Sequence, residues 1–223
     1  MKNYYDEKLN AQKMVRVYET ALPRVRQYLQ AEIDFVKERL AKAQRVLELG
    51  AGYGRIVKEL APYCGEIVGI DISKDSVELG KNYLKDCPNA AMVVMDVHKM
   101  EFEQPFDVVL CLQNGLSAMR ADSAVIQAVL NTLSPGGTAY FSSYSEHFWN
   151  WRLAWFEEQA EKGLLGEIDY DKTKDGVIVC KDGFRAVTHS PDDLRSIGES
   201  SGYPYEVREV DESSVFLIIR KNG

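Results

Sequence analysis

The fold is first recognised in VLELGAGYGR, residues 46–55. An apolar run typical of a strand buried on both faces leads directly into three alternating glycines, and a helical stretch follows from about Arg55. Glycines at such a point let the backbone turn sharply and lie against a ligand, toward which the first amides of the helix are directed. A tight strand-to-helix turn without a ligand is the alternative interpretation.

The same alternation of strand-like and helical segments continues along the chain on the carboxyl side of this loop. Short apolar runs alternate with helical stretches or short connections, which favours a doubly wound α/β fold with a mostly parallel sheet. We place this core at about 44–145. The runs are RVLELG (45–50), EIVGID (66–71), AAMVVMD (90–96), FDVVLCL (106–112) and TAYFSSY (138–144).

The core is preceded by an N-terminal region and followed by the rest of its own domain. Residues 1–43 read as N-terminal helices, over about 3–20 and 23–42, and form a candidate lid. Residues 44–223 form the main domain, with an insertion at about 146–189. Within the insertion, two Lys-Asp-Gly turn signals bracket the short strand VIVC, which predicts a small antiparallel hairpin before the last helix.

Composition and charge narrow the class of protein. The 223 residues, 45% of them hydrophobic and 27% charged, suit one soluble globular domain with a lid. The net charge of −7 disfavours nucleic acid as a partner, because such binding depends on Lys and Arg contacts to phosphate. No apolar run is long enough to span a membrane, and the polar N-terminus does not resemble a signal peptide, so we expect a cytoplasmic protein.

Two aspartates follow the second and third predicted strands. Asp71 ends EIVGID, where an acidic side chain can accept hydrogen bonds from ribose hydroxyls. Asp96 ends AAMVVMD, where a carboxylate can accept from an adenine amino group. A helix cap or a surface turn is the alternative for either residue taken alone.

Together these motifs resemble the class I S-adenosylmethionine-dependent methyltransferases, most strongly over 44–145. The closing pair YEVREV and SVFLIIR also resembles that family, in which an antiparallel last strand inserts into a seven-stranded sheet. The resemblance implies cofactor contacts at the ends of four strands. These residues are Glu48, Gly50, Gly52 and Gly54 beside the methionine part, Asp71 and Ile72 at the ribose, Asp96 and Val97 at the adenine, and Leu112 and Gln113 at the methionine end or the acceptor.

The acceptor side is predicted from the aromatic segment 145–163. Trp149, Trp151 and Trp155 lie on a predicted helix with aromatic residues on two faces, so we expect at least one of them to wall the acceptor pocket. Ordinary packing is the alternative. Tyr5 and Tyr18 of the N-terminal helices are further pocket candidates, again with an ordinary amphipathic helix as the alternative.

Three polar residues are candidates for a catalytic role. His147 follows the fifth strand and could act as a general base, although such a histidine is more often solvated. Tyr144 and Asn114 are comparable candidates. Leu112-Gln113-Asn114-Gly115 departs from the Asn/Asp-Pro-Pro-aromatic motif of methyltransferases acting on adenine or glutamine amino groups, which favours a small-molecule acceptor.

The resemblance therefore predicts an enzyme that transfers the methyl group of S-adenosylmethionine to an O, N, S or C atom of a small molecule, without a metal. A binding module of the same fold that does not turn over the cofactor is one alternative. A nicotinamide-dependent oxidoreductase is the other, but Arg55 stands where its fingerprint needs a third glycine.

Overall fold

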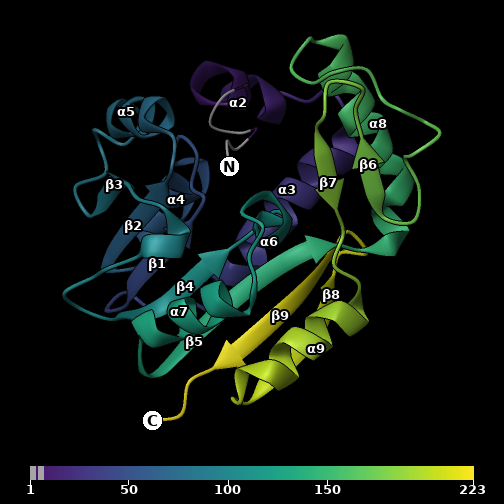
Figure 1. The fold of residues 1–223 in the computed structure, drawn as a ribbon. Coiled ribbons are helices and arrows are strands. Elements are labelled where there is room, and N and C mark those ends of the chain that lie inside the picture. The colour runs from purple at the N-terminus through teal and green to yellow at the C-terminus, as the bar shows by residue number, and fades with distance from the viewer. Residues whose placement is uncertain (1–3, 5–7) are drawn as a thin grey trace.

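The computed structural model describes residue 4 and residues 8–223, and its centre is a seven-stranded sheet ordered β3-β2-β1-β4-β5-β9-β8 (Figure 1). Strands β1 to β5 pair in parallel, whereas β9 runs antiparallel to both of its neighbours, β5 and β8. The predicted α/β fold with an inserted antiparallel last strand is confirmed. The strands are β1 (Arg45–Leu49), β2 (Glu66–Asp71), β3 (Ala90–Val94), β4 (Phe106–Cys111), β5 (Leu133–Tyr144), β8 (Tyr205–Val210) and β9 (Ser214–Arg220).

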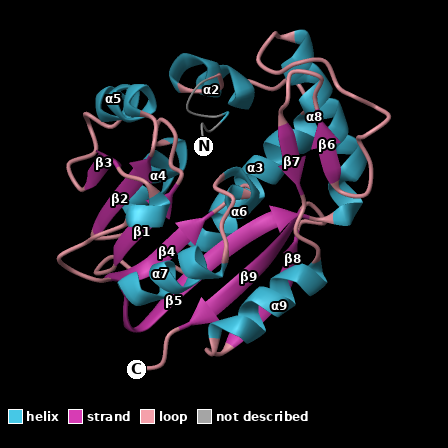
Figure 2. Cartoon of the chain, in the orientation of Figure 1, coloured by secondary structure: helices cyan, strands magenta, loops and turns pink. Residues whose placement is uncertain are grey.

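Helices cover both faces of this sheet (Figure 2). Helices α3, α4 and α5 pack on one face, while α7 and α9 pack on the other. The helices are α2 (Ala11–Tyr18), α3 (Pro23–Lys37), α4 (Arg55–Leu60), α5 (Lys74–Tyr83), α6 (Gly115–Ala118), α7 (Ser123–Thr132), α8 (Trp149–Glu161) and α9 (Pro191–Ser201), with single 3-10 turns η1 (Ala61–Tyr63), η2 (Val97–Lys99) and η3 (Glu146–Phe148).

The two-sided burial explains the continuous apolar runs in the sequence. Successive side chains of a strand point to opposite faces of the sheet. Val46 of β1 accordingly lies in the core under α3 to α5, and its neighbour Leu47 lies in the core under α7 and α9. Both faces of the central strands therefore require apolar residues, and no polar alternation appears.

The N-terminal helices differ in extent from the prediction. Pro23 begins α3 as expected, but α2 spans only Ala11–Tyr18. Asn10 is extended and the Ala11 amide donates to Ser76 Oγ of α5 at 2.9 Å, which fixes the start of α2 there. Figure 1 shows α2 above the carboxyl ends of the strands, between α5 and α8.

The predicted insertion consists of η3, α8 and an antiparallel hairpin of β6 (Val177–Val179) and β7 (Arg185–Val187). Arg152 of α8, only 1% exposed, donates to the carbonyl oxygens of Gly176 and Ala186 and to Thr188 Oγ1. Its guanidinium also lies 4.4 Å from the centre of the Tyr144 ring. These contacts attach the hairpin to α8.

The insertion shares a third apolar core with the N-terminal helices. This core combines Val17 and Tyr28 of the N-terminal helices with Trp155 and Phe156 of α8 and Phe184 of the hairpin. The N-terminal helices and the insertion are therefore packed as one layer over the end of the sheet. None of the described helices is both long and apolar enough to cross a bilayer.

Candidate active site

A cavity of about 540 Å³ lies at the carboxyl ends of β1, β2 and β4, beneath this layer. Three parts of the chain form its walls, and they meet only in the folded protein. The core contributes Glu48, Gly50, Gly52, Asp71, Ile72, Asp96, Val97, Leu112 and Gln113; the N-terminal part contributes Leu9, Met14, Val17 and Tyr18; the insertion and the strand before it contribute Tyr144, Trp155, Phe156, Gln159 and Phe184.

The glycine loop owes its shape to backbone conformation. Gly50, Gly52 and Gly54 all have left-handed φ angles, of 67°, 55° and 82°. Gly50 and Gly52 line the cavity. Gly54 lies behind it as the cap of α4, where a Cβ atom would come within 3.1 Å of Leu84. The structure therefore brings two of the three predicted loop glycines to the cavity.

Asp71 joins the glycine loop to the end of β2. Its carboxylate accepts from the Gly52 amide at 2.8 Å and from the Ser73 amide at 2.9 Å, and the residue lines the cavity beside Ile72. Asp96, at the end of the next strand, accepts from the His98 amide at 2.9 Å and lies in the same wall as Val97. Adjacent parallel strands thus bring both aspartates to one edge of the cavity.

Glu48 is a buried carboxyl group, 4% exposed, in the wall of the cavity. Burial raises its pKa to about 8, and the positive charge of Arg55 offsets part of that rise. Among the described residues, nothing hydrogen-bonds to its Oε2 atom. A buried polar atom without a partner is costly, so this oxygen is suited to a ligand cation.

The turn after β4 carries Leu112, Gln113 and Asn114. Gln113 and Asn114 have φ angles of 54° and 61°, which are uncommon for residues other than glycine. Leu112 and Gln113 line the cavity. Asn114 lies behind the turn, where its Nδ2 donates to the Val187 carbonyl and its Oδ1 accepts from Ser143. The structure thus gives Asn114 a role in holding the turn against the hairpin.

Glu32 of α3 is a buried residue that the sequence analysis did not select. It is fully buried, accepts from the Gln113 amide at 2.9 Å and from Ser214 Oγ at 2.7 Å, and so holds the strained turn in place. Burial raises its pKa to about 7. Its position three residues after Leu29 and four before Val36, within the apolar stripe of the helix, was the available signal.

Part of the cavity wall is aromatic. Tyr18, Tyr144 and Trp155 line it as candidates from the sequence, and Phe156 and Phe184 join them. The indole nitrogen of Trp155 donates to the Val17 carbonyl at 3.1 Å, which links α8 to α2. Burial raises the pKa of Tyr144 to about 12, so its hydroxyl stays protonated at neutral pH.

The remaining candidates lie away from the cavity. Trp151 is 44% exposed, and Trp149 packs beside the guanidinium of Arg152. The His147 ring lies at the surface, 2.9 Å from a carboxylate oxygen of Glu209 that raises its pKa. Tyr5 lies outside the described residues. Over residue 4 and residues 8–223, no group of three or more His, Cys, Asp or Glu side chains is arranged to hold a metal ion.

Comparison with known proteins agrees with this architecture. Residues 46–137 match the family model described as a methyltransferase domain. A ubiquinone biosynthesis O-methyltransferase of Hydrogenovibrio crunogenus is 25% identical over 146 residues, which are 63% of this chain and 60% of that protein. The chain spans about half the length of other curated relatives with the same name.

Two solved structures share the fold over nearly the whole chain. A methyltransferase from Clostridium acetobutylicum has a TM-score of 0.64 at 15% identity, covering 95% of this chain and 98% of that one. The N-methyltransferase NodS from Bradyrhizobium japonicum, solved with S-adenosylhomocysteine, has a TM-score of 0.58 at 14% identity, with full coverage of both chains. The fold is that of class I S-adenosylmethionine-dependent methyltransferases. The match to the methyltransferase domain in sequence covers residues 46–137, the central part of this fold.

Proposed function

We propose that the protein transfers the methyl group of S-adenosylmethionine to a small-molecule acceptor. The observation that carries the proposal is the cavity itself, in which the carboxyl groups of Glu48, Asp71 and Asp96 line the same space as a set of aromatic side chains. Carboxylates suit a cofactor that carries a sulfonium, an ammonium and ribose hydroxyls but no phosphate. The relatives named as O-methyltransferases favour oxygen as the attacked atom.

The proposed roles are those that the resemblance to class I methyltransferases implies, for residues that line this cavity. Glu48 accepts from the ammonium group, Asp71 from the ribose hydroxyls, and Asp96 with the Val97 backbone reads the adenine. Leu112 and Gln113 lie at the methionine end. Since S-adenosylmethionine brings an already activated methyl group, this chain mainly has to align the acceptor with the methyl–sulfur bond and keep water out. Trp155, Tyr144 and Phe184 are placed to do this.

The test is calorimetry with S-adenosylmethionine, S-adenosylhomocysteine and NAD, followed by assay of labelled methyl transfer to a panel of hydroxylated aromatic compounds. We expect binding of the first two ligands and not of NAD. Tight NAD binding without binding of the other two would overturn the proposal. Binding without transfer to any acceptor would favour the non-catalytic module instead.

The raised pKa of Glu48 makes cofactor binding depend on pH. With a pKa of about 8, the free carboxyl is mostly protonated at pH 7, but an ammonium group requires the carboxylate. Binding should therefore release a proton, and affinity should rise between pH 6 and pH 8. Calorimetry at pH 7 in phosphate and in Tris measures this release directly. Glu48→Gln should abolish it, and equal apparent enthalpies for the wild type in both buffers would contradict the assignment.

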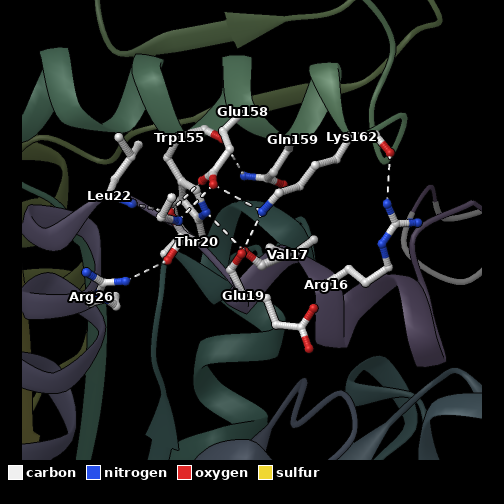
Figure 3. A network of polar contacts seen from close by, with 11 residues as sticks. Arg16, Val17, Glu19, Thr20, Leu22, Arg26, Trp155, Glu158, Gln159 and Lys162 are labelled. Atoms are coloured by element: carbon white, nitrogen blue, oxygen red, sulfur yellow. Dashed lines mark hydrogen bonds and ion pairs between the residues drawn. The ribbon is translucent and has the colours of Figure 1, made fainter.

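We also propose that the segment around α2 is a lid over the cavity. Figure 3 shows how it is attached to α8. Glu158 accepts from Thr20 Oγ1 and from the Ala21 amide, the latter at 2.8 Å, while Lys162 Nζ donates to the Glu19 carbonyl at 2.6 Å. On the other side, the amide of Ala11 is bound to α5. The segment therefore bridges the two sides of the cavity and must loosen for ligands to exchange.

Weakening this attachment should speed ligand exchange. Glu158→Ala removes hydrogen bonds to a charged group worth about 1.5–3 kcal/mol each, so we expect S-adenosylhomocysteine to dissociate at least roughly tenfold faster. Stopped-flow displacement measures the rate. Glu161→Ala, an exposed acidic residue at the end of the same helix, is the matched control. Equal dissociation rates for the wild type and both variants would contradict the lid.

A further inference from the structure

Gln159 of α8 is a polar residue among the aromatic side chains of the cavity wall, and it has no part in the proposed cofactor contacts. It is 3% exposed and lines the cavity. It belongs to the buried stripe of α8, with Trp155 and Phe156 one turn before it. A carboxamide in apolar surroundings costs free energy unless hydrogen bonds satisfy it, so its place in this wall requires a partner.

Only one side of the Gln159 carboxamide is satisfied within the protein. Its Nε2 atom donates to the Trp155 carbonyl at 3.3 Å (Figure 3), and this is its side chain's one hydrogen bond to the described residues. A carbonyl oxygen can only accept, so the bond fixes the amide nitrogen toward the helix and leaves Oε1 on the other side. Oε1 is not among the fully enclosed side-chain atoms that lack a partner, so this acceptor opens onto the cavity.

The parts of the wall around the insertion and the N-terminal helices carry no charge. Apart from Gln159, the side chains that they bring to the cavity are aliphatic, thioether or aromatic. The indole nitrogen of Trp155 is already bonded to the Val17 carbonyl, and the raised pKa of Tyr144 keeps its hydroxyl neutral. A ligand held by these side chains is therefore uncharged and mainly apolar, since a charge placed against them would lose its hydration without compensation.

The shape of the same wall favours a flat ligand. The ring of Phe156 lies 6.1 Å from that of Trp155 and 5.7 Å from that of Phe184, measured between ring centres. Such rings give a planar ring both stacked and edge-on contacts. Gln159 adds one open hydrogen-bond acceptor to these contacts.

We propose that Gln159 is an acceptor-recognition residue, whose Oε1 atom accepts a hydrogen bond from a neutral donor, such as a hydroxyl group, on an uncharged aromatic acceptor. The inference rests on the proposed function, because the same cavity then holds both the cofactor and the acceptor. It adds the chemical class of the acceptor and the side chain that selects it.

Titrations of the protein saturated with S-adenosylhomocysteine test this assignment. The probes are phenol, anisole and benzoate, which share one ring and carry a donor, no donor and a negative charge. Saturation-transfer NMR follows their binding. The wild type should bind phenol roughly threefold to tenfold more tightly than anisole, and it should bind benzoate more weakly than phenol.

Gln159→Met tests the side chain itself, because methionine has a similar length and no amide. This variant should bind anisole as the wild type does and should lose the preference for phenol. Gln159→Leu is a second variant with the same expectation. Gln127→Met, on the exposed face of α7, is the matched control and should keep the preference. Unchanged affinity for S-adenosylhomocysteine and an unchanged Tm show that a variant keeps its fold and cofactor site.

Three results would overturn the inference while leaving the proposed function in place. They are a phenol preference that persists in the folded Gln159 variants, a wild type that binds benzoate as tightly as phenol, and a wild type that binds S-adenosylhomocysteine but does not prefer phenol to anisole. A wild type that binds neither S-adenosylmethionine nor S-adenosylhomocysteine is a different result, because it overturns the proposed function itself.

Discussion

Asp71→Ala is expected to weaken S-adenosylhomocysteine binding by at least roughly tenfold and by up to a thousandfold. The variant removes two proposed hydrogen bonds between a carboxylate and the ribose, worth about 1.5–3 kcal/mol each at best. It also removes the acceptor for the Gly52 and Ser73 amides, so the glycine loop loses its tie to β2. Calorimetry gives the affinity directly.

Asp71 is half-buried at the end of a strand, so we expect the fold to survive its replacement. Circular dichroism and thermal melting check this point. Asp75→Ala, an exposed acidic residue in the first turn of α5, changes the charge equally and should bind the cofactor normally. If Asp71→Ala binds with unchanged affinity, the ribose is held by other residues.

Arg152→Met is expected to cause the largest loss of stability among the changes considered. It leaves the carbonyl groups of Gly176 and Ala186 without their buried donor, and each such loss costs about 1–3 kcal/mol. A total of about 3 kcal/mol lowers the Tm of a chain of this size by about 6–12 °C. Thermal unfolding followed by circular dichroism measures the shift.

Two further variants test whether the loss of stability comes from the missing hydrogen bonds of Arg152 or from the loss of its charge. Arg152→Lys keeps the charge but lacks the planar fork, so its Tm should lie between those of the wild type and Arg152→Met. Arg195→Met, on the exposed side of α9, should change stability by no more than about 0.5 kcal/mol. A Tm of Arg152→Met equal to that of the wild type would show that the hairpin does not depend on this side chain.

The fold and the cofactor end of the cavity could be predicted from the sequence because the information is local. Each parallel strand places its own carboxyl end at the same edge of the sheet, so the residues that end β1, β2, β3 and β4 must gather there. The apolar runs locate the strands, and the glycines locate the loop. Their roles toward the cofactor remain predictions until binding is measured.

The proposed acceptor side of the cavity was predicted less well, because α8 buries polar residues together with aromatic ones. The buried stripe of α8 is Arg152, Trp155, Phe156 and Gln159, at helical spacing. A search of the sequence for apolar faces instead predicts that Phe148, Trp151 and Trp155 share one face of a helix. Phe148 lies in η3, before α8 begins, and Trp151 is exposed. A buried arginine that holds a hairpin 30 residues away leaves no signal in hydrophobic periodicity.

The position of His147 depended on pairing between distant strands. His147 follows β5 closely, in η3, as predicted, but its ring is held by Glu209 of β8. That contact exists because β9 pairs with both β5 and β8, so that β8 lies one strand beyond β9 and within reach of the segment that follows β5. Neither the strand order nor the register of this pairing is contained in the local sequence around His147.

The insertion of β9 between β5 and β8 also determines when the sheet can be completed during synthesis of the chain. Strand β5 has its full complement of backbone partners only when Ser214–Arg220 have left the ribosome, although β5 itself is synthesised about 70 residues earlier. Until then a long strand edge stays open on the nascent chain, and such edges pair readily with other chains. We therefore expect the sheet to close after synthesis of this segment rather than during it, and a chaperone that shields β5 in the interval would raise the yield of native protein.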